Sequence, residues 1–141
     1  GIMVETPAAV LMAEELAKEV DFFSIGTNDL TQYILAADRG NQKLTKLYDP
    51  FHPAVLRAVA QVIQAGHKAG IEVGMCGEFA GDEGAVPLLV GMGLDECSMV
   101  SSEIAAVRYQ IRGISAEQMK HLADRVLAAV TVKEVKQLLE R

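Results

Sequence analysis

The chain has 141 residues and a net charge of −6 at neutral pH, and half of its residues are hydrophobic. This length allows one domain with a substantial core. The acidic balance argues against nucleic-acid binding, which needs a basic face against phosphate, and no apolar run reaches the roughly 20 residues that cross a bilayer. Only two cysteines are present, Cys76 and Cys97. We therefore expect no disulfide framework and no zinc site, and a cytoplasmic location.

Apolar runs and helical spacings alternate along the chain, which is the pattern of a parallel α/β fold. In chain order the pattern predicts a strand at 1–5, a helix from 7 to about 18, a strand at 22–25, a helix over about 30–37, a loop at 38–53, a helix over 55–69, a strand at 71–75, a helix at 83–90, a short strand at 97–100, a helix at 101–111 and two tail helices within about 115–141. The first strand begins at the first residue, so we expect the chain to be a piece of a longer protein.

Several residues are typical of helix boundaries. Gly70 is a good helix terminator because glycine readily adopts the left-handed conformation. The expected N-caps are Thr6 (before Pro7), Asn28 or Asp29, Ser101 or Ser102, Ser115 and Thr131. The loop at 38–53 is long for a compact domain, which favours a functional role.

Two architectures fit the alternating strands and helices. The near-continuous apolar strands favour a parallel sheet buried on both faces, either in an open three-layer sandwich or in an arc of a (β/α)8 barrel. A whole barrel takes about 250 residues. This chain supplies about three of the eight βα units plus tail helices, so a barrel interpretation makes residues 1–141 a single partial domain.

Polar or reactive residues follow three of the predicted strands: Glu5, Asp29 and Cys76. Parallel strands end at one edge of a sheet, so we expect these side chains to converge there. Taken singly, each carboxylate could equally be a capping or loop residue. Together they suit Mg²⁺, which is usually held by one or two carboxylates and a substrate phosphate. An acid–base pair is the less favoured alternative, because no nucleophile accompanies the carboxylates.

Further residues extend this hypothesis. Asn28 could donate to a phosphate oxygen. Arg39, in the long loop, is either a solvated surface residue or a ligand-binding residue whose guanidinium makes two hydrogen bonds to a carboxylate or phosphate. Cys76 is an inert buried thiol, a nucleophile or a proton donor. No histidine lies near it in sequence and an ordinary thiol stays protonated at neutral pH, which favours the donor role, with Glu78 as a candidate orienting group. We interpret Cys97 as structural, and the three histidines as structural or exposed.

Two motifs resemble the phosphoenolpyruvate-utilising family of enzymes: GTNDLTQ at 26–32 and MCGE at 75–78. Longer stretches resemble the enzyme I branch, from the bacterial sugar phosphotransferase system, more than the pyruvate phosphate dikinase or phosphoenolpyruvate synthase branches. These stretches are FFSIGTNDLTQY at 22–33, DRGN at 38–41 and GMCGEFAGD at 74–82. The similarity covers nearly the whole chain and loosens after about residue 111.

The resemblance implies a role for each matched position. Glu5 and Asp29 would be the protein ligands of Mg²⁺. Asn28 and Arg39, with Asp29, would bind phosphoenolpyruvate. Cys76 would protonate the enolate to give pyruvate. In the enzyme I branch the phosphoryl group passes to a histidine on a separate amino-terminal domain and then to the carrier protein HPr, and the barrel forms a homodimer.

The same resemblance also shows what this sequence lacks. The phosphoryl-accepting histidine motif, two arginines from earlier barrel strands and the first five strands have no counterpart here. The chain would then be the C-terminal portion of the barrel, from a cytoplasmic enzyme with Mg²⁺ as cofactor. The alternatives are a dimer-forming structural fragment without turnover of its own, or the corresponding part of pyruvate phosphate dikinase or phosphoenolpyruvate synthase.

Overall fold

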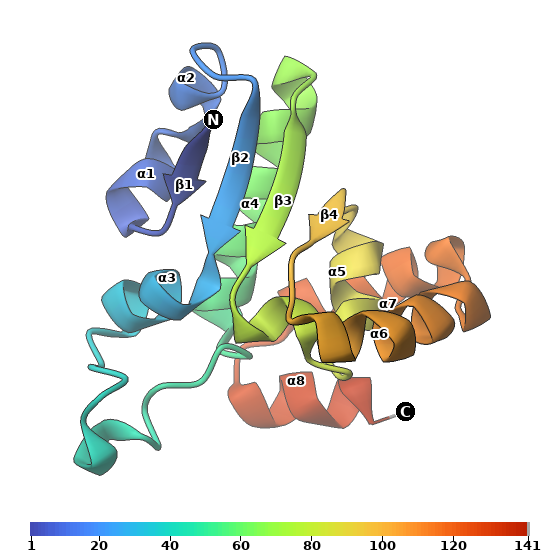
Figure 1. The fold of residues 1–141 in the computed structure, drawn as a ribbon. Coiled ribbons are helices and arrows are strands. Elements are labelled where there is room, and N and C mark those ends of the chain that lie inside the picture. The colour runs from blue at the N-terminus through green and yellow to red at the C-terminus, as the bar shows by residue number, and fades with distance from the viewer. Residues whose placement is uncertain (141) are drawn as a thin grey trace.

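The computed structural model describes residues 1–140, in which short strands alternate with helices (Figure 1). The strands are β1 (Ile2–Val4), β2 (Phe22–Gly26), β3 (Glu72–Cys76) and β4 (Glu96–Cys97). The helices are α1 (Pro7–Leu11), α2 (Ala13–Leu16), α3 (Thr27–Leu35), α4 (Pro53–Ala69), α5 (Val86–Met92), α6 (Ser101–Gly113), α7 (Ala116–Ala128) and α8 (Val132–Leu139), with 3₁₀ turns η1 (Gln42–Leu44) and η2 (Glu78–Gly81).

The four strands form one parallel sheet in the order β1-β2-β3-β4. A doubly wound sheet reverses its strand order at a switch point, and no reversal occurs here. Right-handed crossovers that always step in one direction place their helices on the same side of the sheet, as Figure 1 shows for α4 behind β2 and β3. This arrangement is an arc of a (β/α)8 barrel, which confirms the predicted fold class and excludes the three-layer sandwich.

The face of the sheet under the helices forms the core. Side chains alternate between the two faces of a strand, and the register aligns Phe23 with Val73, and Val4 with Ile25 and Met75. Each of these five side chains is at most 1% exposed. Burial of one such side chain contributes about 1.5–3 kcal/mol. The apolar stripe of α4 covers them with Leu56, Val59, Val62 and Ile63.

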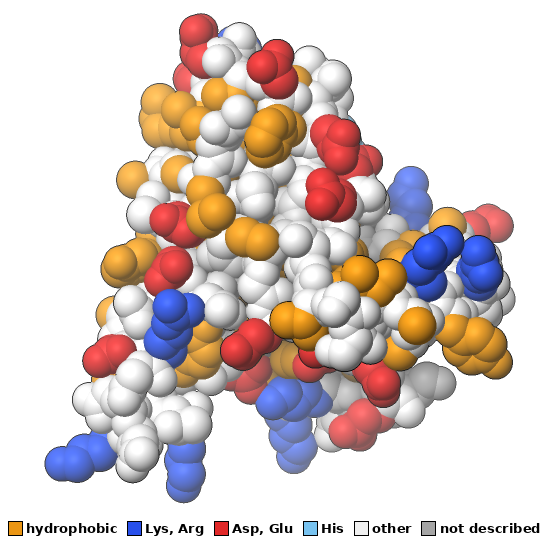
Figure 2. Space-filling model, in the orientation of Figure 1, with side chains coloured by type: hydrophobic (Ala, Val, Ile, Leu, Met, Phe, Trp, Pro, Cys, Tyr) orange, Lys and Arg blue, Asp and Glu red, His pale blue; other side chains and the backbone are white. Residues whose placement is uncertain are grey.

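Among residues 1–140, no helix covers the opposite face of the sheet (Figure 1). Here the register aligns Met3, Ser24, Gly74 and Glu96. Met3 is 52% exposed, and the space-filling view of this side shows a mixed surface over the strands instead of a continuous apolar coat (Figure 2). The expectation of a sheet buried on both faces is therefore not met within residues 1–140.

Most predicted helix boundaries are confirmed. The Thr6 side chain accepts a hydrogen bond from the Ala9 N–H (3.2 Å) and caps α1. Ser115 and Thr131 cap α7 and α8 in the same way. Gly70 ends α4 with φ of 76°, a left-handed conformation that favours glycine.

Three boundary predictions are wrong. The first helix is interrupted at Met12. Asn28 and Asp29 lie inside the first turn of α3 instead of capping it, because α3 begins at Thr27 directly from β2. Val100 takes the N-cap position of α6, ahead of Ser101 and Ser102, and no side chain caps this helix.

Two further elements differ from the sequence pattern: a helix is shifted along the chain and a strand is shorter. The helix predicted at 83–90 is α5 (Val86–Met92), because the Asp82 carboxylate accepts from the N–H groups of Gly84 and Ala85 and holds the preceding residues in a turn. The strand predicted at 97–100 is reduced to Glu96–Cys97.

The last helix is fastened to the end of the 38–53 loop. The Lys136 ammonium on α8 contacts the Asp49 carboxylate at 2.7 Å and lies 5.9 Å from the centre of the Phe51 ring. Phe51 packs edge-on against Phe79 of η2 at 5.0 Å. Within residues 1–140 no helix combines the length and apolar character needed to cross a membrane.

Candidate active site at the strand ends

The uncovered face ends in a polar rim at the carboxyl ends of β1, β2 and β3. Gly26 and Cys76 are paired in the sheet, and Glu5 follows the residue that pairs with Ile25. The Glu5 carboxylate lies over Gly26, where an added Cβ would be 2.7 Å from Glu5 Oε2. Glu5 and Cys76 therefore flank Gly26 on the same face of the sheet.

The Cys76 thiol has two neighbours on β2. The Ser24 hydroxyl donates to Cys76 Sγ at 3.6 Å, and the thiol donates to the Ile25 carbonyl oxygen at 3.7 Å. The second bond needs the thiol proton, because a carbonyl oxygen can only accept. No hydrogen bond joins Glu78 to Cys76 within residues 1–140, and Ser24, which the sequence reasoning missed, supplies the side chain that bonds to the sulfur.

Gly77 lets α3 approach the end of β3 closely. Its φ is 104°, and an added Cβ would lie 2.8 Å from Thr27 Oγ1 and 3.4 Å from Asn28 Oδ1. The Thr27 hydroxyl donates to the Cys76 carbonyl oxygen at 3.2 Å. The Asn28 amide is thus placed beside Cys76 and Gly77. A cleft of about 340 Å³ opens here, lined by Asn28, Cys76, Gly77, Glu78, Ser98, Met99, Val100 and Glu103.

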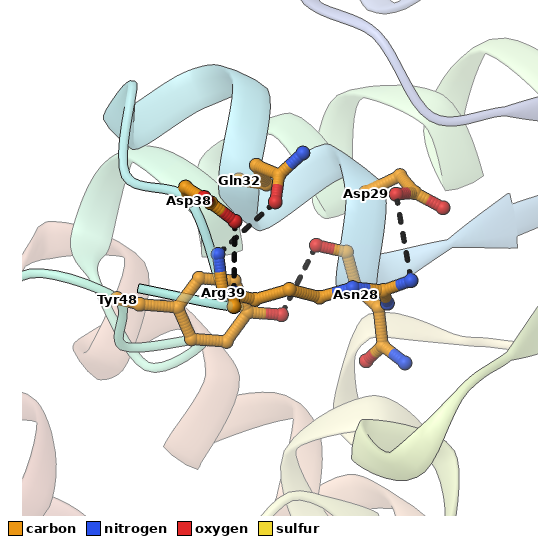
Figure 3. Close-up of polar contacts among 7 residues, drawn as sticks. Asn28, Asp29, Gln32, Asp38, Arg39 and Tyr48 are labelled. Atoms are coloured by element: carbon orange, nitrogen blue, oxygen red, sulfur yellow. Dashed lines mark hydrogen bonds and ion pairs between the residues drawn. The ribbon is translucent and has the colours of Figure 1, made fainter. Parts of the chain in front are cut away.

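Arg39 reaches back from the long loop to the first turn of α3 (Figure 3). Its Nη2 lies 3.9 Å from Asp29 Oδ1, and the two side chains are 49% and 38% exposed. A pair this long and exposed contributes at most about 1 kcal/mol, so a ligand can replace it at little cost. Arg39 also lines a second cleft of about 470 Å³ with Asn28, Tyr48 and Glu78. The two clefts share Asn28 and Glu78.

The start of α3, at the rim, has no side-chain cap. Gly26 is the N-cap residue and has no side chain to accept from the first turn. Uncapped N–H groups at a helix start, together with the helix dipole, attract anions. Asn28 therefore combines a side-chain amide with a favourable helix end.

The two predicted metal ligands come from different elements. Glu5 follows β1, and Asp29 lies in the first turn of α3, three residues after Gly26. No group of three or more metal-binding side chains occurs in the part of the chain described. Mg²⁺ is commonly held by one or two carboxylates, with water and substrate oxygens filling its other positions. Gly26 has no side chain, so it leaves space for the Glu5 carboxylate at the strand ends. This carboxylate fits such a site.

Charge at the rim is predominantly negative. The Glu5 carboxylate lies over Gly26, Glu78 lines both clefts, and Asp29 contacts Arg39, which is the one guanidinium lining either cleft within residues 1–140. Such a set favours a cation over an anion unless further positive charge is supplied.

His52, His67 and Cys97 line neither of the two clefts. His52 accepts from the Ala54 N–H and caps α4, and His67 contacts Asp95 at 2.8 Å. Burial raises the pKa of the Cys97 thiol, and the nearby Glu96 adds to this, so Cys97 is a poor nucleophile.

Comparison with known proteins finds a family model and curated relatives that match the chain. Residues 1–116 match the protein-family model described as "PEP-utilising enzyme, PEP-binding domain". The chain is 55% identical over 139 residues to phosphoenolpyruvate-protein phosphotransferase of Staphylococcus aureus, covering 99% of this chain and 24% of that protein. It is 53% identical over 141 residues to the protein of the same name from Listeria monocytogenes, covering all of this chain and 25% of that protein. The chain thus spans about a quarter of the length of these curated relatives.

Proposed function

The chain belongs to the family of PEP-utilising enzymes, and from this premise we propose that it is the phosphoenolpyruvate- and Mg²⁺-binding part of an enzyme I, a phosphoenolpyruvate-protein phosphotransferase. In this proposal the parent protein is cytoplasmic and serves sugar uptake. It transfers the phosphoryl group to a histidine on another domain and then to HPr, and it releases pyruvate. The observation that carries the proposal is the meeting of Glu5, Asn28 and Cys76 around Gly26 and Gly77.

Binding of phosphoenolpyruvate would use the donors at the start of α3. The Asn28 amide and the Arg39 guanidinium both face the cleft lined by Asn28, Arg39, Tyr48 and Glu78. A guanidinium fork can bind a phosphate or carboxylate through two hydrogen bonds. Mg²⁺ held by Glu5 and Asp29 would supply positive charge against the phosphoryl oxygens.

Cys76 would supply the proton that completes the reaction. When the P–O bond of phosphoenolpyruvate breaks, the phosphoryl group goes to the accepting histidine and the bond's electrons stay on the enolate oxygen. The enolate methylene carbon then takes the thiol proton, forming a C–H bond and giving pyruvate. The thiolate recovers a proton from solvent. The Ser24 hydroxyl, which donates to Cys76 Sγ, would stabilise the thiolate in the interval.

The charge balance supports the idea that this chain works as part of a larger protein. Phosphoenolpyruvate is strongly anionic, and Arg39 is the one guanidinium that lines either cleft within residues 1–140. We therefore expect the isolated chain to bind phosphoenolpyruvate weakly or not at all. The parent protein would supply the missing cations.

Self-association of the barrel is a second part of the proposal. Exposed apolar side chains gather over α6 (Figure 2), where Val100 is 60%, Ile104 43% and Tyr109 83% exposed. Large exposed apolar patches commonly mark interfaces. Sedimentation of the parent protein should give a dimer, and a monomer at working concentrations would contradict this part.

The decisive test is Cys76→Ala in the parent protein. We expect pyruvate formation to fall by about 10²–10⁴-fold, the contribution of a general acid, while calorimetry shows phosphoenolpyruvate binding with Mg²⁺ retained. Cys97→Ala, which removes the other thiol, is the matched control and should keep normal turnover. Near-normal turnover of Cys76→Ala would remove the proton-donor role.

A further inference from the structure

The loop that carries Arg39 is fastened to α3 by two side-chain hydrogen bonds within residues 1–140. Near its start, the Arg39 N–H donates to Gln32 Oε1 at 3.0 Å. Near its end, the Tyr48 hydroxyl donates to the Asn28 carbonyl oxygen at 3.0 Å (Figure 3). Between these points the side chains of Asn41 and Thr45 bond only within the loop.

Tyr48 lies at the edge of the proposed site. It lines the same cleft as Asn28, Arg39 and Glu78. Burial raises the pKa of the Tyr48 phenol, although the nearby Arg39 acts in the opposite direction, so the phenol keeps its proton at neutral pH. A protonated phenol remains a hydrogen-bond donor to the Asn28 carbonyl throughout the working pH range.

We propose that Tyr48 is a positioning residue for the phosphoenolpyruvate site: its hydroxyl holds the loop against the first turn of α3 and so keeps the Arg39 guanidinium beside Asn28. This inference rests on the proposed function. The observation that supports it is the hydrogen bond from the Tyr48 hydroxyl to the backbone of Asn28, whose side chain lines the cleft. A loop held in its binding position loses less conformational entropy when the ligand arrives.

A role in packing alone explains Tyr48 less well. Tyr48 is half-buried and lies outside the buried core cluster that includes Phe23, Leu56 and Phe79. Removal of its hydroxyl leaves the ring in place, so we expect only a small loss in the free energy of unfolding. The hydroxyl is instead directed at the helix turn that carries two proposed ligand-binding residues, Asn28 and Asp29.

The kinetic test is Tyr48→Phe in the parent protein. We expect KM for phosphoenolpyruvate to rise about 5-fold, the effect of one hydrogen bond, with kcat changed by less than about 2-fold. Loss of an interaction that binds the substrate and the transition state equally raises KM and leaves kcat unchanged. Tyr33→Phe, at an exposed position that lines neither cleft, is the matched control and should behave as the unaltered protein.

A double substitution tests whether Tyr48 acts through Arg39. In an Arg39→Gln background, Tyr48→Phe should change KM by less than about 2-fold, because contacting residues do not contribute additively. An unchanged KM for Tyr48→Phe alone, or the same rise in both backgrounds, would overturn the inference. If the unaltered parent fails to bind phosphoenolpyruvate with Mg²⁺, the proposed function itself fails, which is a different result.

Limited proteolysis gives a readout that does not depend on activity. The loop contains three trypsin sites, at Arg39, Lys43 and Lys46. Without substrate, Tyr48→Phe should be cut there about 5-fold faster than the unaltered protein, because proteolysis follows the population of the opened loop. Cleavage at the same rate in both proteins would show that the hydroxyl does not hold the loop.

Discussion

The two faces of the sheet come from the same strands and differ in almost every physical property. On the helix-covered face, Phe23 and Ile25 are fully buried. On the uncovered face, the neighbouring Ser24 contacts the Cys76 thiol and Gly26 leaves room for the Glu5 carboxylate. Adjacent residues of one strand thus serve stability and the candidate site in turn. A substitution on one face should therefore affect the fold, and one on the other face the chemistry.

The largest expected effect is a difference in stability loss between substitutions at two neighbouring aromatic residues of β2. Phe23 is fully buried and Phe22 is 48% exposed. We expect Phe23→Ala to reduce the free energy of unfolding by about 4 kcal/mol through lost burial and a cavity. Phe22→Ala should cost less than about 1 kcal/mol. Urea denaturation of both variants measures the difference, and equal losses would contradict the assignment of the two faces.

A smaller effect is expected where β3 meets α3. Gly77 has φ of 104°, and a Cβ would collide with the Thr27 hydroxyl. We expect Gly77→Ala to cost about 2 kcal/mol of stability, and to weaken phosphoenolpyruvate binding by displacing Asn28. Gly113→Ala is the matched control, since Gly113 has open space around it and no positive φ. If both variants bind phosphoenolpyruvate equally well and have the same free energy of unfolding, the close approach of α3 to β3 at Gly77 does not matter for either property.

The smallest expected effect lies at the other end of the strands, away from the site. Burial opposes the charged form of Asp95, but bonds from the Val73 N–H and from His67 outweigh it, so its pKa lies below the ordinary value of 3.8. Its contribution to stability is therefore present above the unfolded pKa and is lost as pH falls through the lower folded pKa. With the side chain 38% exposed, we expect Asp95→Asn to cost about 0.5 kcal/mol.

The pH dependence checks this assignment. Urea denaturation at pH 6 should show that cost, and the difference between the two proteins should vanish well below about pH 3. A difference that persists in acid would mean that packing, and not the carboxylate charge, stabilises this corner. Turnover should be the same in both proteins at neutral pH, because Asp95 lies outside both clefts at the rim.

The alternation of strands and helices could be predicted because each buried strand is a short apolar run. Helix starts were harder. Thr27, Asn28 and Asp29 are all typical capping residues, but the strand runs straight into α3, and the Thr27 hydroxyl is bonded to β3 instead of to its own helix. No glycine or proline marks the interruption at Met12. The local sequence pattern thus predicts which residues are buried, but it does not predict hydrogen bonds between distant parts of the chain.

The same limit applies to the candidate site. Glu5, Asp29 and Cys76 could be singled out because they follow apolar strands. Their residue types suggested Mg²⁺ ligands and a proton donor, and the family resemblance implied the same roles. Ser24 and Tyr48 could not, since their partners lie 52 and 20 residues away in the chain. Alternation on β2 was the one available signal for Ser24, because it places Ser24 on the face of Gly26.

The sequential strand order has a consequence for how the chain acquires its structure during synthesis on the ribosome. The pairs Ile2–Phe23 and Gly74–Glu96 join residues that are close in the chain. The pair Phe23–Val73 joins residues that are much farther apart, so it can form only later in synthesis. Closure of a longer segment costs more entropy, so docking of the third strand, after the long loop and α4 have emerged, is the step that we expect to limit the rate. Until then the edge of β2 stays open, and a nascent chain stalled in that interval is the form most exposed to aggregation.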